Sequence, residues 1–358
     1  MNETVEHFLT QTGPVFCLDI GSGTQDALLA LPNESLYNWP RWVFPSPARR
    51  IAHLIHEATE KKRDIFLFGS TMGGGIGEAV TRHIALGLKV YATEAAAATL
   101  HDDQKRVQAM GIELRECCPQ RAYPIHLADF SQEFWFNLLT MLNLPLPSLT
   151  IASAQDHGFS PAGNRTFRMQ TWKTLLCESK EISSWIYHTV PKPLTRLAAL
   201  AQSTAGPVAD TGTSALLGFL CEQSLVDRSF REGITLVNAG NTHILAALLY
   251  QGRVFGLYEQ HTGLVDKDHL SRDLHDFRLG WLPIEQVQEE RGHGTAYAER
   301  PQEAGSFDAT FITGPAREKY AGLGRFTNPC GDMMQAGCFG LIHGLASQHQ
   351  KNSRENTL

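Results

Sequence analysis

The sequence has 358 residues, of which 42% are hydrophobic, with 31 Lys and Arg against 37 Asp and Glu and a formal net charge of −6. This is the composition of an ordinary soluble globular protein, and at roughly 150 residues per domain it predicts about two domains. The mild negative charge and the absence of a basic block argue against a nucleic acid or an anionic membrane as the main partner.

The N-terminal stretch and the cysteines predict a cytoplasmic protein. Residues 1–12 carry Glu3 and Glu6 and lack the basic and apolar regions of a signal peptide. No apolar run approaches the roughly 20 residues that a membrane-spanning helix requires. The seven cysteines are an odd number and are scattered along the chain, which fits a reducing compartment better than a disulfide framework.

Strand-like and helix-like segments alternate from residue 15 to about residue 220, and this pattern predicts an α/β fold. The strands expected in this half are 15–20, 27–31, 64–68, 88–91 and 148–152. The helices expected are 48–62, 77–87, 94–110 and 132–142. The Pro-rich piece 39–47 is expected to be a loop or an edge strand, because proline cannot donate a hydrogen bond to a strand ladder.

A second zone of strands begins near Gly233. The strands expected there are 234–238, 244–250, 254–257 and 305–313. A polar helical pattern covers about residues 266–300, and the polar tail from Gln348 onward is expected to be frayed.

Two Gly-containing turns, LDIGSGTQD at residues 18–26 and NAGNTHI at residues 238–244, each join a pair of apolar strands. Backbone N–H groups in such turns can converge on an anion, although the first turn alone is equally well explained as a tight hairpin. Asp19, at the end of the first strand, is placed to hold Mg²⁺ through water. Two such turns are what two half-domains would need to clamp a polyphosphate from opposite sides. The turn residues are Gly21, Ser22, Gly23 and Thr24 in the first and Gly240, Asn241 and Thr242 in the second.

These turns resemble the two phosphate loops of the actin, heat-shock ATPase and sugar-kinase superfamily. Three further segments are similar to motifs of that superfamily and follow its order. They are the first linking helix at 210–218, the adenosine-contacting strand and turn at 311–315 with Gly314, and the second linking helix at 335–340. The resemblance implies ATP and Mg²⁺ bound in a cleft between two ribonuclease-H-like lobes. The lobes would cover residues 13–230 with 331–347, and residues 231–330, followed by a frayed tail over 348–358.

The chain as a whole also resembles an uncharacterised family within that superfamily, sometimes labelled pyruvate formate-lyase activating-like. The sequence lacks the CxxxCxxC cluster that a radical-activating enzyme would need, so we discount that label. The second loop carries Asn238 where relatives usually carry Asp, and an amide is a poorer metal ligand than a carboxylate. Metal binding is therefore expected mainly at Asp19.

Asp210 opens the first linking helix, at the position where the sugar-kinase branch carries the base that deprotonates the acceptor hydroxyl. The resemblance therefore implies that Asp210 and Asp19 are the catalytic residues, since phosphoryl transfer needs little more than alignment, charge neutralisation and a base. The alternative is that Asp210 only caps the helix. The Gly-rich segment 69–77 lacks the Lys-Ser/Thr of a P-loop, so it is expected to be a substrate-side loop or a structural turn.

Four histidines, at positions 157, 243, 261 and 293, stand in turn-like settings. Because loops at strand ends converge on the ligand crevice of an α/β lobe, we expect His157, His243 and His261 to face the cleft. Their expected role is to bind the anionic group of the acceptor or a divalent metal, with Asp156 orienting His157. A solvated or core-bonded histidine is the simpler interpretation of any single one. Arg165 and Arg168 are candidates for a carboxylate or phosphate clamp, or for surface charge.

The sequence therefore predicts an ATP-dependent phosphotransferase acting on a small hydroxylated or carboxylated metabolite. Two alternatives stay open: an ATPase that drives a partner enzyme by opening and closing its lobes, and a non-catalytic nucleotide-dependent sensor. Asn238 is the best argument for the sensor. A homodimer is compatible with all three.

Overall fold

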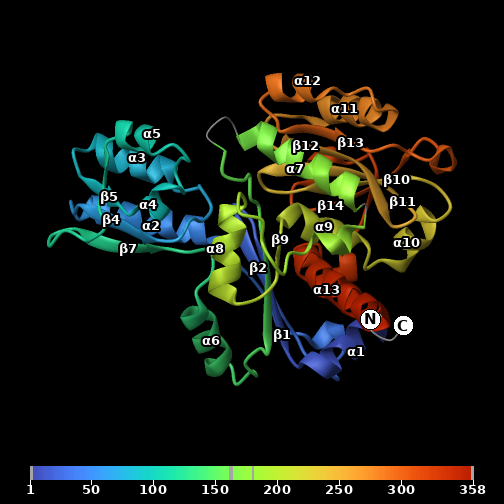
Figure 1. Cartoon of the computed structure of the whole chain (residues 1–358), viewed down its shortest axis with the longest axis horizontal. Coiled ribbons are helices and arrows are strands. Elements are labelled where there is room, and N and C mark those ends of the chain that lie inside the picture. Colours follow the sequence, from blue (N-terminus) through green and yellow to red (C-terminus); the bar gives the residue numbers. More distant parts are fainter. Residues whose placement is uncertain (1–2, 161–163, 180, 356–358) are drawn as a thin grey trace.

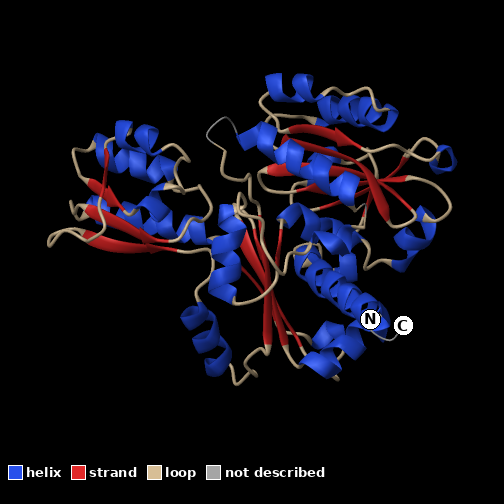
Figure 2. Ribbon diagram, in the orientation of Figure 1, coloured by secondary structure: helices blue, strands red, loops and turns tan. Residues whose placement is uncertain are grey.

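The computed structural model describes residues 3–160, 164–179 and 181–355, whose strands form three separate sheets (Figures 1 and 2). No helix in these ranges is both long enough and apolar enough to cross a membrane. Two of the sheets form the lobes, and the third forms a smaller part on one side of the molecule.

The first sheet has the strand order β3-β2-β1-β8-β9. Its strands are β1 (Val15–Ile20), β2 (Thr24–Ala30), β3 (Arg41–Pro45), β8 (Leu149–Ala154) and β9 (Val208–Ala209). The first three run antiparallel in a meander, and β8 and β9 then add in parallel beside β1. This order is that of a ribonuclease-H-like lobe. Helices α6 (Gln132–Met141) and α8 (Thr195–Thr204) belong to it, and β3 confirms the edge strand expected in the Pro-rich piece.

The second sheet repeats the same order, as β12-β11-β10-β14-β15, with β13 added beside β12. Its strands are β10 (Ile234–Ala239), β11 (His243–Tyr250), β12 (Arg253–His261), β13 (Gly294–Tyr297), β14 (Ala309–Thr313) and β15 (Arg325–Phe326). Helices α11 (Lys267–Leu279) and α12 (Ile284–Glu289) lie on its outer side, and α7 (Asn164–Glu178) packs on β12 and β13. The fold class of two ribonuclease-H-like lobes is therefore confirmed.

The third sheet, β6-β5-β4-β7, is entirely parallel and has its own apolar core. Its strands are β4 (Ile65–Gly69), β5 (Val90–Ala92), β6 (Ile112–Leu114) and β7 (Tyr123–Leu127). Its helices are α2 (Pro47–Glu60), α3 (Gly77–Ala85), α4 (Glu94–Ala97) and α5 (Gln104–Ala109). The sequence pattern did not separate this insertion from the first lobe, because alternating strands and helices look the same locally in both.

Three expected elements differ in the structure. The helix expected over residues 94–110 is divided into α4 and α5, and Asp103 caps the second of these. The polar helical zone 266–300 ends in strand β13. The tail expected to be frayed continues α13 (Ala336–Glu355), because Gln348 donates hydrogen bonds to two backbone carbonyl groups and the ring of His349 packs on Phe8. The remainder of that tail, 356–358, lies outside the described residues.

Two helices link the lobes and cross each other tightly. Helix α9 (Thr211–Phe219) leads from β9 into the second lobe through α10 (Gln223–Ser229), and α13 returns to pack on β1, β2 and β8. A Cβ atom on Gly218 would lie 2.4 Å from the carbonyl oxygen of Ala336, and one on Gly340 would lie 2.1 Å from that of Ser214. The crossing therefore has no room for a side chain. One apolar core contains residues of β1, α9, β10 and α13, so the lobes share it.

We predict that Gly218→Ala lowers the free energy of unfolding by about 1–3 kcal/mol, since the added methyl group must push the two helix backbones apart. Alanine has the higher helix propensity, so a stabilised variant would show that the crossing tolerates the methyl group. Gly77→Ala is the matched control, because a Cβ atom at Gly77 meets nothing within 4 Å. Urea unfolding of both variants measures the difference.

Candidate functional site

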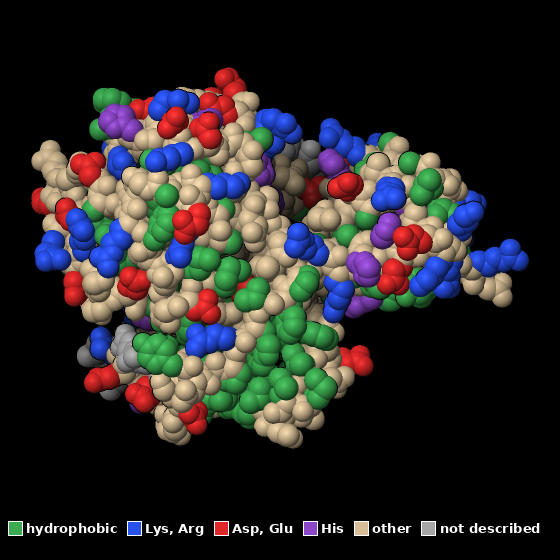
Figure 3. Space-filling view, turned by 180° about the vertical axis from the view of Figure 1, so that it is seen from behind, with side chains coloured by type: hydrophobic (Ala, Val, Ile, Leu, Met, Phe, Trp, Pro, Cys, Tyr) green, Lys and Arg blue, Asp and Glu red, His purple; other side chains and the backbone are tan. Residues whose placement is uncertain are grey.

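A cavity of about 590 Å³ lies where the two lobes and the inserted part meet. It is visible as a hollow between the inserted part and the second lobe in Figure 3. Both Gly-containing turns, the ends of β1, β8 and β10, and the segment 71–75 line it. The residues that the sequence analysis placed here and that do line the cavity include Asp19, Gly21, Ser22, Thr24, Asp156, His157, Arg168, Gly240, Asn241, Thr242, His243 and Gly314.

The two turns are built alike and meet across the cleft. The N–H group of Gly21 donates to the carbonyl oxygen of Thr24 at 2.9 Å, and that of Gly240 donates to the carbonyl oxygen of His243 at 2.9 Å. The hydroxyl groups of Ser22 and Thr242 are hydrogen-bonded to each other. A Cβ atom on Gly23 would lie 2.8 Å from the side-chain nitrogen of Asn241, so Gly23 permits this close approach. The turns therefore form one continuous floor for a ligand.

Asp19 stands at the end of β1, in a nest of hydroxyl groups. Its Oδ1 accepts hydrogen bonds from Ser153 at 2.6 Å and from Thr211 at 2.7 Å. Burial raises the pKa of Asp19, although these hydrogen bonds oppose the shift. A Cβ atom on Gly337 would lie 2.0 Å from Oδ2, so the start of α13 closes over the carboxylate only because this residue is glycine.

A second carboxylate, Asp26, lies directly opposite Asp19 on β2. Its Oδ1 is buried and has no hydrogen-bond partner within the described part of the chain. Burial and the neighbouring Asp19 raise the pKa of Asp26 to about 8. Both side chains line the cavity, and a divalent cation between or beside them would balance their charge. The sequence analysis missed Asp26, although a hairpin register with the turn at residues 21–23 brings it opposite Asp19.

A buried ion network crosses from the first lobe to the second. Arg168, on α7, donates two hydrogen bonds to Asp210, at 2.8 and 3.1 Å, and one to Glu259 on β12, at 2.6 Å. Glu259 is 2% exposed and also accepts hydrogen bonds from Trp172 and Gln155. Burial alone would raise the pKa of Glu259, but the Arg168 guanidinium holds it well below its ordinary value. The carboxylate is therefore ionised at neutral pH.

This network changes the interpretation of two predicted site residues. Asp210 is absent from the described residues that line the cavity, and its two oxygens bind Arg168 and the N–H groups of Gly212 and Asp156. The structure therefore favours the capping role of Asp210 over that of a base. Arg168 lines the cavity, but its donors are used by carboxylates and by the carbonyl oxygen of Asp156, so it does not serve as a free substrate clamp. Arg165 is exposed and outside the cavity lining.

Asp156 fixes the backbone on both sides of His157. Its Oδ1 accepts a hydrogen bond from the N–H group of Gly158 at 2.8 Å, and its Oδ2 accepts one from that of Leu197 at 2.9 Å. Gly158 has φ of +74°, and a Cβ atom there would lie 2.1 Å from the ring of Phe167. Asp156 thus positions His157 through the backbone, as an Asx turn, rather than through a bond to the imidazole ring.

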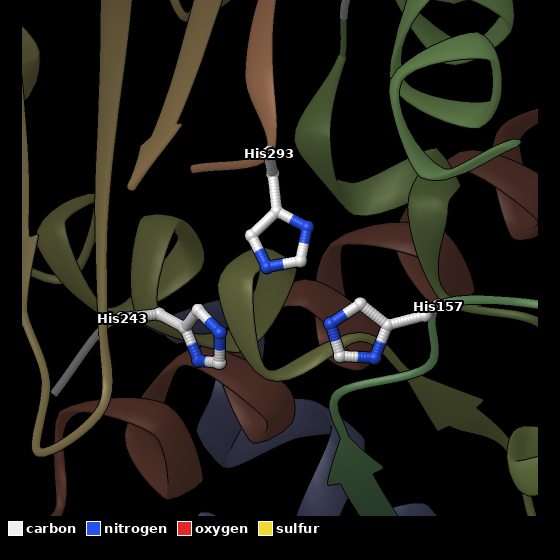
Figure 4. Close-up of side chains that lie close together, drawn as sticks. All are labelled: His157, His243 and His293. Atoms are coloured by element: carbon white, nitrogen blue, oxygen red, sulfur yellow. The ribbon is translucent and has the colours of Figure 1, made fainter. Parts of the chain in front are cut away.

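The histidines that were expected to share a site do lie together. The ring centroids are 4.5 Å apart for His243 and His261, 6.0 Å for His157 and His243, and 4.9 Å for His157 and His293. His157 and His243 line the cavity, whereas His293 lies behind them, 3% exposed. Figure 4 shows the rings of His157, His243 and His293 pointing toward a common centre from three different elements. The rings therefore cluster, with His293 among them, but His261 is absent from the described residues that line the cavity, contrary to the expectation that it faces the cleft.

The imidazole rings of the cluster are held neutral by their surroundings. Burial lowers the pKa of His243 to about 3 and that of His293 to about 4, and it lowers the pKa of His157 well below its ordinary value. A neutral imidazole offers a lone pair but no positive charge. The cluster is therefore poorly suited to attract an anion by charge, and well suited to bind a metal cation.

The inserted part contributes one wall of the cavity through the segment 69–77. Residues 71–75 line the cavity, and a substrate-side role for this loop stays a prediction. The loop rests on a buried ion pair between Asp129 and Arg196, at 2.7 Å, and the N–H group of Gly73 donates to Asp129. Arg196 also donates to the carbonyl oxygen of Gln155 at 2.7 Å. No local pattern in the sequence indicates this pair, because its members are 67 residues apart.

The strand order of both lobes and the cleft between them define a member of the actin, heat-shock ATPase and sugar-kinase superfamily. Within it, the chain belongs to the family described as "Putative pyruvate format-lyase activating enzyme (DUF1786)", whose model matches residues 72–319. No curated protein matches the sequence.

Several solved structures align over most of the chain. The ethanolamine utilization protein EutJ from Carboxydothermus hydrogenoformans has 9% identity and a TM-score of 0.32, over 92% of this chain and 88% of its own. A Bacteroides thetaiotaomicron protein with an actin-like ATPase fold and unknown function has 10% identity and a TM-score of 0.31, over 92% and 96%. MreB 5 of Spiroplasma citri, bound to AMPPNP, has 11% identity and a TM-score of 0.30, over 97% and 99%. At these scores, the fold assignment rests on the strand order of the chain itself.

We predict that Arg168→Met lowers the free energy of unfolding by about 3–5 kcal/mol at pH 7, because it leaves buried carboxylates without a partner. Arg165→Met is the control, and as an exposed change it should stay within about 0.5 kcal/mol of wild type. Denaturant unfolding monitored by fluorescence measures both.

The same pair of variants predicts a pH dependence. In the wild type the pKa of Glu259 is depressed below its ordinary 4.5, so its contribution to stability is present above that pH and is lost as the pH falls further. In Arg168→Met, burial without the guanidinium raises the pKa of Glu259, so protonation relieves the cost. The stability difference should therefore shrink between pH 7 and pH 5. A constant difference would show that the guanidinium acts by packing alone.

Proposed function

We propose that this chain is an ATP-dependent phosphotransferase that acts on a small hydroxylated or carboxylated metabolite. The observation that carries the proposal is the pair of like-built turns, one from each lobe, that meet across a cavity with a carboxylate at the end of the first strand. The phosphates of ATP would lie between residues 21–24 and residues 240–242, where the backbone N–H groups of the turns offer donors to an anion. The adenosine would lie near Gly314, at the end of β14.

Mg²⁺ fits the chemistry of the carboxylates beneath the first turn. A hard cation prefers oxygen ligands and binds through one or two carboxylates together with phosphates and water. Asp19 and Asp26 supply those oxygens, and the unpartnered Oδ1 of Asp26 fits the role of a ligand to such a cation. When bound, Mg²⁺ would neutralise charge on the transferring phosphoryl group. The chain's part would be to hold the ion below the turns and to align the phosphates.

The acceptor would bind on the side of the cavity formed by His157, His243 and the segment 71–75. Neutral imidazole groups can donate and accept hydrogen bonds to hydroxyl or carboxyl oxygens of a small molecule. Because Asp210 is held by Arg168, proton removal from the acceptor falls to another group on this side. When no metal ion is bound to it, the neutral imidazole of His157, which lines the cavity on a fixed backbone, is the group placed to accept that proton.

A nucleotide-dependent ATPase or sensor is the second candidate function, and Asn238 favours it. Asn238 occupies in the second lobe the place that Asp19 occupies in the first, since each lies one residue pair before the turn in its antiparallel ladder. An amide at that place cannot act as a base, which supports slow turnover with a retained nucleotide. Such a protein would act on a partner enzyme through movement of its lobes.

We predict that Asp19→Asn weakens Mg²⁺-dependent binding of ATP at least about tenfold, which corresponds to 1.4 kcal/mol. Isothermal titration calorimetry with ATP, in the presence and absence of Mg²⁺, measures the change. Asp268 is an exposed carboxylate at the start of α11, so Asp268→Asn is the matched control and should bind ATP like the wild type. Equal binding by wild type and Asp19→Asn would remove Asp19 from the site, and no binding by either would remove the nucleotide.

Release of ADP distinguishes the candidate functions. We expect ADP production by the wild-type chain to depend on a metabolite, which screening a panel of small hydroxylated and carboxylated compounds would reveal. Release stimulated by a partner protein instead would favour the ATPase, and binding without turnover would favour the sensor.

A further inference from the structure

We propose that His157, His243 and His293 form a three-histidine site for a divalent transition-metal ion, of which Zn²⁺ is the type, distinct from the magnesium site at Asp19. One ring nitrogen of each residue lies within 4.8 Å of the ligand nitrogens of the other two. Figure 4 shows the three rings arranged around one point. Ligand nitrogens around a tetrahedral Zn²⁺ are separated by roughly 3.3 Å, for a Zn–N distance of about 2.0–2.1 Å. Small rotations of the side chains would therefore close the set on an ion.

Three ring nitrogens of this cluster, on His243 and His293, are left without the partners that buried imidazoles normally have. His293 is 3% exposed, yet neither of its ring nitrogens has a hydrogen-bond partner in the described structure. The same holds for Nε2 of His243. A buried polar atom without a partner costs roughly 1–3 kcal/mol, so three of them in contact need an explanation. A metal ion that uses one lone pair from each histidine removes most of this cost.

The backbone around the cluster is arranged to hold the three rings in place. The turn closed by Asp156 positions His157, and His243 begins β11 directly after the second phosphate-loop turn. The N–H group of His293 donates to the carbonyl oxygen of Glu259 at 3.1 Å, at the start of β13. Glu259 is itself fixed by Arg168. The buried ion network of the two lobes thus sets the spacing of the ligands.

The donor set selects the kind of ion. Three imidazole nitrogens suit Zn²⁺ and its transition-metal neighbours, whereas Mg²⁺ and Ca²⁺ prefer carboxylate and carbonyl oxygens. His261, the fourth histidine nearby, is left out of the ligand set, because its ring hydrogen-bonds the backbone of Thr242. The other cluster of possible metal ligands in the described chain, His269 with Asp273 and Glu290, differs in that its imidazole already has a carboxylate partner at 2.9 Å.

Three protein ligands leave a fourth position open, as in catalytic zinc sites. His157 and His243 line the cavity, so that position would face the acceptor side. An ion there would bind a hydroxyl or carboxyl oxygen of the acceptor. This role rests on the proposed phosphotransfer, but the binding of the metal does not. His157 belongs to the first lobe, and His243 and His293 belong to the second, so the ion would also tie the lobes together.

The test is titration of the metal-stripped full-length chain with Zn²⁺ alone, in the absence of nucleotide. Calorimetry with competition by a chromophoric chelator measures stoichiometry and affinity. We expect one Zn²⁺ per chain and a rise in thermal stability on binding. His157→Ala, His243→Ala and His293→Ala should each weaken binding at least about 100-fold, while His269→Ala, the control at the other cluster, should bind like wild type. Co²⁺ in place of Zn²⁺ should give the intense visible absorption of a four-coordinate site.

Each outcome of this titration either supports or overturns the three-histidine metal site. Loss of binding in the three variants, with His269→Ala unaffected, supports the site. No binding by the wild type, unchanged affinity in His157→Ala and His243→Ala, or loss of binding in His269→Ala would overturn it. His157 and His243 are partly exposed, so their variants remain informative even if removal of the buried His293 prevents folding. Because no nucleotide is present, failure of the metal site and failure of ATP binding in the Asp19→Asn experiment are separate results.

Discussion

The buried contact between Arg168 and Glu259 is the interaction on which the geometry of the cleft depends. Arg168 comes from the first half of the chain and Glu259 from β12 of the second lobe, and the two lie 2.6 Å apart. Buried charges are tolerated only when they are paired, so each lobe needs the other to complete this pair. Through Asp210 the same guanidinium holds the start of α9, and through the carbonyl oxygen of Asp156 it holds the loop of His157. One ion network therefore fixes a linking helix, a strand and a site loop together.

The two lobes show what an internal repeat of fold does and does not conserve. Both β1-β2 and β10-β11 close their turns with the same hydrogen bond, yet the first turn leads to Thr24 and the second to His243. Likewise Asp19 and Asn238 end corresponding strands. The carboxylates Asp19 and Asp26 thus lie in the first lobe, whereas two of the three clustered imidazoles, His243 and His293, lie in the second. The repeated fold places two similar turns on either side of the cleft, and the residues that differ between the turns give each side its own chemistry.

Much of this arrangement was predictable from the sequence, and the reasons for the failures are physical. Strands such as 15–20 and 234–238 were predictable because short apolar runs end in glycine turns. The clustering of His157 and His243 followed from their places after strand ends. The insertion with the third sheet escaped because its local pattern matches that of the lobes. The capping role of Asp210 was among the alternatives that the sequence left open, but its ion pair with Arg168 escaped, because residues 42 positions apart leave no local mark of such a contact.

Two sets of contacts hold the lobes in their relative position: those at the crossing of the linking helices and those across the cleft. At Gly218 and Gly340 the linking helices lie backbone to backbone, with no room for a side chain between them. On the far side, the contacts that span the cleft include the hydrogen bond between Ser22 and Thr242, the ring contacts of His157 with His243 and His293, and the buried Arg168 network. Opening the lobes widely would expose the charges of Arg168 and Glu259 together, which water would compensate in part. A ligand that bridges the two turns, or an ion that bridges His157 and His293, would stabilise only the arrangement in which the two lobes are close together. The nucleotide and the metal ion would therefore both act by changing the position of one lobe relative to the other.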